Sequence, residues 1–165
     1  MKRNDSTHET VAGTPGGVYK RFFDHNPDAL VYCDEQGSVV DANGAFFLFT
    51  GCGKHEIPGK AFRQFFLNPA EADRLFREAR EGGVDSREVR LLGADASEAD
   101  CQVSLHPVKD AQGGIAGYVG IIRDISRIMH DREDLKSTAR DLSERIRELN
   151  CLYEISEVID LKGRT

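Results

Sequence analysis

The 165-residue sequence contains no tryptophan and no long apolar run. A helix needs roughly 20 consecutive apolar residues to cross a bilayer, and no segment approaches that length. The N-terminal stretch MKRNDSTHETVAGTPGG is polar from its first residues and has no apolar segment of the kind found in secretory signals. We therefore expect a cytoplasmic protein that does not insert into membranes.

The sequence also has no cluster of basic residues. It carries 22 Lys and Arg against 28 Asp and Glu, which gives a formal net charge of -6. Proteins that bind nucleic acids need grouped Lys and Arg side chains to contact the phosphates. A nucleic-acid partner is therefore not expected.

The four cysteines are spaced too widely for the common metal motifs. Cys33, Cys52, Cys101 and Cys151 form no CxxC pair. Structural zinc sites and c-type haem attachment both require such close pairs. In a reducing cytoplasm we expect four free thiols and no metal site.

The apolar pattern over residues 18–126 predicts a mixture of short helices and strands. A polar, disordered leader is predicted for residues 1–17. Asn43 is suited to cap a helix, because its side-chain oxygen can accept from unpaired first-turn N–H groups. Strands are predicted at 29–33, 38–42, 84–92, 98–108 and 115–125, and helices near 18–23, 44–51, 60–67 and 71–81.

Two early strands, several helices and three late strands indicate an α+β fold. Strands and helices that are segregated along the chain favour a five-stranded antiparallel sheet with short helices on one face. The last strand, IAGYVGIIRDI at 115–125, is apolar on both sides. This pattern is typical of a central strand that is covered on both faces.

A long C-terminal helix is predicted over residues 126–159, which contain neither Gly nor Pro. Its apolar residues repeat every seven positions, as in a coiled coil. Because a lone helix would expose this stripe, we expect a parallel homodimer. One row contains Ile128, Leu135, Leu142 and Leu149, and the second row contains Ala139, Ile146 and Tyr153.

Several strings in this order resemble the PAS family of sensor domains. They are NPDA at 26–29 with VYCDEQG at 31–37, VDAN at 40–43, IPGK at 57–60, HPVKD at 106–110, and GYVGIIRDIS at 117–126. Each string is weak by itself, but together they cover residues 18–126 at the spacing of the family. The resemblance implies a PAS fold for 18–126, a signalling helix for 127–160 and a short tail at 161–165.

The resemblance also implies a role in signal transduction. Helices of this kind join sensor modules in sensor histidine kinases and diguanylate cyclases, and residues 150–160 are similar to the first helix of a GAF-like domain. The chain is thus expected to be a regulatory part of a longer signalling protein, with an output domain downstream, and not an enzyme. Asp124, Ile125 and Ser126 are the expected hinge between sheet and helix.

The PAS resemblance implies a core that in some members holds a small ligand. Ten apolar side chains are expected in this core, and two interpretations of them stay open. They line a ligand pocket, or they fill the core of a ligand-free interaction and dimerisation module. The candidates are Phe46, Phe49, Cys52, Phe62, Phe65, Phe66, Leu75, Cys101, Val103 and Leu105.

The identity of any cofactor is not indicated. Haem-binding members carry a His on the helix that corresponds to 71–81, and this segment has none; His55 and His106 are weak alternatives. Members that form a flavin adduct carry a Cys where this chain has Ala61. Neither haem nor a covalent flavin adduct is therefore expected, whereas a small metabolite is compatible with the sequence.

A second function is suggested by His130, which is followed by Asp131, Arg132 and Glu133. This string resembles the start of a histidine-kinase phosphoacceptor box. The box's Pro is missing and no ATP-binding domain follows, so the phosphoacceptor role is the weaker alternative.

Overall fold

The computed structural model describes the backbone of residues 15–162 and the side chains of residues 16–151. The chain divides into two compact units, Met1–Ile125 and Ser126–Thr165, which we describe separately. No helix within the described residues is both long enough and apolar enough to span a bilayer.

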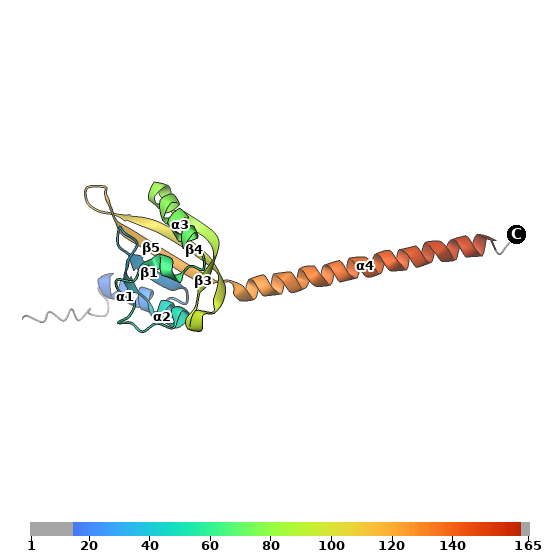
Figure 1. Cartoon of the computed structure of the whole chain (residues 1–165), viewed down its shortest axis with the longest axis horizontal. Helices are drawn as coiled ribbons and strands as arrows, with labels where there is room; N and C mark the ends of the chain where they lie inside the picture. The colour runs from blue at the N-terminus through green and yellow to red at the C-terminus, as the bar shows by residue number, and fades with distance from the viewer. Residues whose placement is uncertain (1–14, 163–165) are drawn as a thin grey trace, which may run out of the picture. The chain divides into compact units, whose positions relative to one another are not determined.

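The first unit is built on a five-stranded antiparallel sheet in the order β2-β1-β5-β4-β3 (Figure 1). The first and last strands along the chain are neighbours, because β5 pairs with β1 on one side and with β4 on the other. The predicted fold class is confirmed. The strands are β1 (Ala29–Cys33), β2 (Val39–Ala42), β3 (Val84–Leu92), β4 (Glu98–Lys109) and β5 (Ile115–Asp124).

The helical segments between β2 and β3 supply the second layer. These are α2 (Gly44–Thr50), the 3-10 turn η1 (Phe62–Phe65) and α3 (Pro69–Gly82), with a further 3-10 turn, η2 (Ala94–Ala96), between β3 and β4. Asn43 caps α2 as predicted, and Gly51 ends it in the left-handed region at φ 67°.

Two helical segments between β2 and β3 differ from the sequence prediction. The segment 60–67 forms only the single 3-10 turn η1, because Phe62, Phe65 and Phe66 all turn into the core. Pro69 does not simply break that segment. It begins α3, where its missing N–H is of no consequence, and Asn68 caps the helix by accepting from Ala70 N.

The N-terminal helix α1 (Pro15–Asp24) starts three residues earlier than expected, within the stretch assigned to the leader. The rest of that leader, residues 1–14, lies outside the described residues. Val18, Tyr19 and Phe22 are exposed on α1.

Side chains of β5 point alternately to the two faces of the sheet, and only one of its faces is well covered by the described residues. Tyr118, Gly120 and Ile122 of β5 are buried, whereas Val119 and Ile121 are 36% and 38% exposed. The prediction that β5 is central is confirmed. The expectation that both of its faces are covered is wrong for this part of the chain.

The second unit is the single helix α4 (Ser126–Lys162). It begins at residue 126, as predicted, and continues three residues past the predicted helix end at 159. Every side chain from Arg127 to Cys151 is exposed except Met129, which is half-buried. The apolar stripe of α4 is therefore exposed along the described part of the helix.

Candidate functional site

The side chains predicted to line a pocket gather in one place, between the sheet and the helical layer. Eight of the ten are buried members of a single hydrophobic cluster, and Phe49 and Cys52 are half-buried at its edge. The sequence prediction therefore located the interior of the domain. The buried members are Phe46, Phe62, Phe65, Phe66, Leu75, Cys101, Val103 and Leu105.

Within this cluster the aromatic rings contact one another. Phe62 is fully buried and lies 5.3 Å from Phe66 and 6.1 Å from Phe76 between ring centroids, both edge-to-face. Phe46 and Phe65 form a third edge-to-face pair at 5.3 Å. Such pairs add about 0.5–1.5 kcal/mol each beyond the burial of their area. The rings thus form a continuous packed layer.

The cysteines of the core are poor nucleophiles. Burial, with a smaller contribution from Asp34, raises the pKa of the Cys33 thiol to about 12. Burial, followed by Asp124 and Asp100, raises the pKa of Cys101 to about 12 as well. A thiol reacts as its thiolate, so both are unreactive at neutral pH. The half-buried Cys52 differs, since Lys60 Nζ donates to its Sγ at 3.8 Å.

The positions that carry cofactors in relatives can be located directly. The segment 71–81 lies in α3, and Ala61 is a half-buried residue just before η1. His55 and His106 are exposed, and His106 Nε2 lies 3.4 Å from Asp85 Oδ1. Among the described residues, no three His, Cys, Asp or Glu side chains are grouped as metal ligands would be.

The predicted hinge is short and partly fixed. β5 ends at Asp124, α4 begins at Ser126, and only Ile125 lies between them. Ile125 is 8% exposed, and its N–H donates to Asp100 O on β4 at 2.8 Å. The last residue before the helix is therefore buried, and its backbone is hydrogen-bonded to the neighbouring strand.

Asn43 has more partners than a helix cap requires. Its Oδ1 accepts from Phe46 N and also from Leu30 N on β1, at 3.0 and 2.9 Å. Its Nδ2 donates to Asp28 O at 3.0 Å and to Phe23 O at 3.1 Å. This buried amide thus joins α1, β1 and α2.

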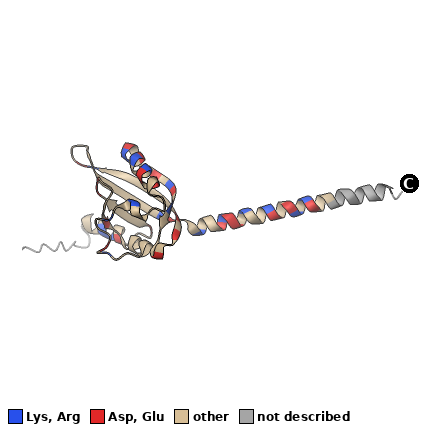
Figure 2. Cartoon of the chain, in the orientation of Figure 1, with Lys and Arg blue, Asp and Glu red and all other residues tan. Residues whose placement is uncertain are grey.

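The apolar rows of α4 are exposed along the described part of the helix. Ile128, Leu135, Leu142, Ile146 and Leu149 are 50–72% exposed. Charges of both signs alternate around them (Figure 2). Tyr153, the last residue of the predicted dimer stripe, has a side chain outside the described residues. His130 is also exposed, with its Nε2 3.6 Å from Asp134 Oδ2 one turn later.

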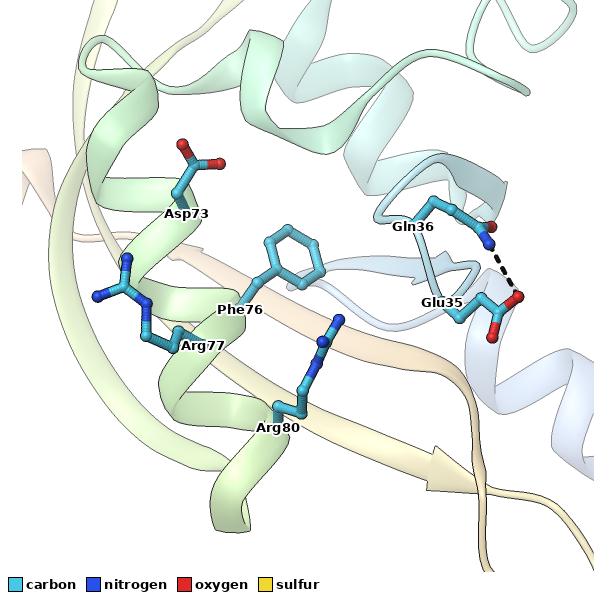
Figure 3. Close-up of a pocket in the computed structure, with 6 residues that line it drawn as sticks. All are labelled: Glu35, Gln36, Asp73, Phe76, Arg77 and Arg80. Atoms are coloured by element: carbon cyan, nitrogen blue, oxygen red, sulfur yellow. Dashed lines mark hydrogen bonds between the residues drawn. The ribbon is translucent and has the colours of Figure 1, made fainter.

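A feature that the sequence reasoning missed lies where α3 faces the β1–β2 turn (Figure 3). Two adjoining cavities of about 290 and 710 Å³ share Glu35, Gln36 and Arg80 in their walls, and we call them together the rim groove. The first also contacts Asp73, Phe76 and Arg77, and the second contacts Ile115 and Tyr118. Arg77 and Arg80 lie three residues apart on one face of α3, and this spacing was the feature of the sequence that could have indicated the groove.

Arg80 connects the rim groove to the sheet. Its Nε donates to Tyr118 Oη at 3.2 Å, and Tyr118 lies fully buried on β5. The ring of Tyr118 packs edge-to-face on Phe76 with 5.0 Å between centroids. The hydrogen bond from Arg80 to Tyr118 and, to a smaller degree, the charge of Glu35 raise the pKa of Arg80 above its ordinary value.

Comparison with protein families identifies the first unit. The model of the PAS domain family matches residues 27–127, which is more than half of the chain. The chain belongs to the PAS domain family. The resemblance drawn from the sequence strings is therefore confirmed, and PAS domains are sensor modules of signalling proteins.

Individual relatives agree with this assignment. The PAS chain is 27% identical over 119 residues to the biofilm dispersion protein BdlA of Pseudomonas aeruginosa. The match covers 70% of this chain but only 28% of that protein, so the chain spans under a third of its length.

Solved structures show the same fold. A PAS domain from Colwellia psychrerythraea has a TM-score of 0.60 at 23% identity, covering 67% of this chain and 96% of that one. An RNA-binding light-oxygen-voltage receptor has a TM-score of 0.66 at 20% identity, covering 85% of this chain and 41% of that one.

Proposed function

We propose that this chain is the sensing and dimerising part of a signalling protein, which relays a change in the PAS core through α4 to an output domain. The observation that carries the proposal is the continuity of β5 and α4 through one residue. β5 contributes Tyr118 and Ile122 to the core, and the same strand leads directly into the helix. A displacement of β5 would therefore reach α4 without an intervening loop.

The helix has the pattern of a parallel dimer. With Ala139 and Ile146 at heptad position a, Leu135, Leu142 and Leu149 occupy position d, where leucine favours two strands. In a parallel pair in register, Asp131 at position g would lie opposite Lys136 at position e of the partner. The other such pairs, Thr138 with Ser143 and Arg145 with Asn150, place no like charges together.

The signal would act by shifting a balance between two packings of the helix pair. Leu152 and Ile155 lie off the heptad rows, so the register changes near Leu149. Helices at such a break can rotate or slide between near-equal arrangements. The chain would act as a regulatory input, with catalysis, such as that of a histidine kinase or diguanylate cyclase, in the domain downstream.

A second candidate is a ligand-free module that only dimerises and spaces other domains. The edge-to-face layer around Phe62 supports it, because packed rings already occupy much of the interior. A phosphoacceptor role for His130 is weaker, since the Pro of the phosphoacceptor box is missing from the residues that follow it.

Native mass spectrometry of the purified chain tests the dimer and the occupied core together. We expect a dimer, and extra mass that is lost on mild denaturation would show that the chain carries a ligand, whereas a bare dimer would favour the spacing module. Leu142→Asp should weaken dimerisation at least about a hundredfold, because it removes apolar burial and places unpaired charges in the seam.

Ser137→Asp is the matched control, because position f points away from the seam and Ser137 is exposed. Circular dichroism should show the PAS unit intact in both variants. A Leu142→Asp chain that remains dimeric would contradict the coiled coil, and would move attention to the exposed Val18, Tyr19 and Phe22 of α1.

A further inference from the structure

Charges of both signs line the rim groove, and Arg80 and Glu35 lie on its opposite walls. Arg80 extends from α3 toward the β1–β2 turn, which carries Glu35 and Gln36 on the other side (Figure 3). The turn is held in place, since Asp34 Oδ1 accepts from Gln36 N at 3.0 Å and from Ser38 N at 2.8 Å. Charge separation across the groove is therefore built into the fold.

The total charge of the lining decides which ligands it favours. Glu35 and Asp73 contribute two carboxylates, and Arg77 and Arg80 contribute two guanidinium groups, so the formal sum is zero. A simple anion or a metal cation gains little from a balanced set of charges. A small molecule with a positive end and a negative end gains at both walls.

The donors that remain on Arg80 suit a carboxylate. Its Nε is engaged by Tyr118, and among the described residues neither Arg80 nor Glu35 forms an ion pair. The two terminal nitrogens of Arg80 can bind the two oxygens of one carboxylate. Across the groove, Glu35 Oε1 accepts a hydrogen bond from Gln36 Nε2 at 2.8 Å. The second carboxylate oxygen of Glu35 can accept from an ammonium group.

The floor of the groove is apolar. The ring of Phe76 lies between α3 and the turn, and Tyr118 and the half-buried Ile115 continue the floor from β5. Phe76 fits closely under Gly37, where an added Cβ would come within 3.2 Å of the ring. Cavities of 290 and 710 Å³ fall near or within the range of roughly 300–1,000 Å³ that is usual for small-molecule sites.

We propose that the rim groove binds a free α-amino acid with an apolar side chain. Its carboxylate pairs with Arg80, its ammonium group pairs with Glu35, and its side chain rests on Phe76 and Ile115. The consequence for signalling rests on the proposed function. A carboxylate that draws Arg80 toward the ligand alters the Arg80–Tyr118 hydrogen bond, and Tyr118 belongs to the strand that leads into α4.

Calorimetric titration of the full chain with L-leucine, L-isoleucine, L-valine, L-methionine and L-phenylalanine tests the binding. At least one should bind at up to millimolar concentration. The amine that lacks its carboxylate and the N-acetyl derivative that lacks its ammonium group should each bind at least about tenfold more weakly, because each leaves one charged wall without its partner. If none of the five binds, or if either derivative binds as well as the amino acid, the proposal is wrong.

Variants place the binding in the groove. Glu35→Gln and Arg80→Gln should each weaken the affinity for the amino acid at least about tenfold. The control substitutions Glu81→Gln and Arg74→Gln change exposed α3 residues outside the groove and should leave the affinity unchanged. Glu35 lies on an exposed turn, so Glu35→Gln remains informative even if Arg80→Gln unfolds. Binding that survives Glu35→Gln would overturn the proposal. The dimer experiment with Leu142→Asp does not involve these residues, so the two ideas can fail separately.

Discussion

Replacing Asn43 with Ala tests whether one buried amide holds three elements of the sensor together. The Ala side chain can replace neither the two bonds accepted by Oδ1 nor those donated by Nδ2 to Asp28 O and Phe23 O. The backbone bond from Asn43 N to Leu30 O, at 3.0 Å, would remain. The substitution therefore removes the side-chain links and leaves the local strand contact.

The expected cost follows from the groups that lose their partners. Loss of a helix cap costs about 1 kcal/mol. The N–H of Leu30 is buried, and a buried donor without a partner costs about 1–3 kcal/mol. We expect the free energy of unfolding to fall by about 3 kcal/mol, a large share of the about 5–15 kcal/mol that is typical of a domain.

Urea unfolding followed by near-ultraviolet circular dichroism measures this change, because the packed aromatic rings lie in the PAS unit. Asn68→Ala is the matched control. Asn68 also caps a helix, but it is exposed and its side chain accepts only from Ala70 N, so its loss should cost about 1 kcal/mol. Equal losses for the two variants would refute the view that Asn43 joins α1, β1 and α2.

Two further predictions concern the core thiols and a glycine. Unfolding frees Cys33 and Cys101 to ionise near pH 9, whereas in the folded protein both have pKa values of about 12. The free energy of unfolding is therefore unaffected by these thiols below pH 9. Above pH 9 it falls by about 1.4 kcal/mol per pH unit for each thiol. In urea unfolding at pH 9–11, Cys101→Ala should make the free energy of unfolding fall less steeply with pH, by the contribution of one thiol. An unchanged slope would contradict the raised pKa of Cys101. Gly83→Ala should cost at least about 2 kcal/mol, because its φ is +90° and a Cβ would lie 2.5 Å from His106 Nδ1. A Cβ added at Gly82 would meet no atom within 4 Å, so Gly82→Ala should be neutral or stabilising. Similar urea-unfolding midpoints for the two glycine variants would show this reasoning to be wrong.

The rim groove adds a second place where the sensor could receive a signal. The core is lined by side chains that contact one another, whereas the groove is already open and charged. Both meet at Tyr118, whose ring packs against Phe76 and whose hydroxyl group accepts from Arg80. A change at either place would therefore act on β5 first.

Local rules in the sequence determined most of the elements. The period of two in 98–108 predicted β4, the heptads predicted α4, and Asn43 before a run of phenylalanines predicted the start of α2. These features depend on neighbours within a few residues, so a sequence pattern records them. The errors occurred where burial decided the outcome, as in the single turn η1, which the phenylalanines of 62–66 form as they enter the core.

The tertiary structure alone decided how distant segments meet. No pattern in the sequence shows that β5 lies between β1 and β4, or that Arg123 on β5 forms an ion pair with Asp28 before β1. The rim groove likewise arises because the Glu35–Gln36 turn and the Arg80 face of α3 are brought together by the sheet order. The sequence by itself therefore determined the family, the core residues and the long helix. The pairing of strands distant in the chain determined which charges face each other, because that pairing depends on closing long loops over a common core.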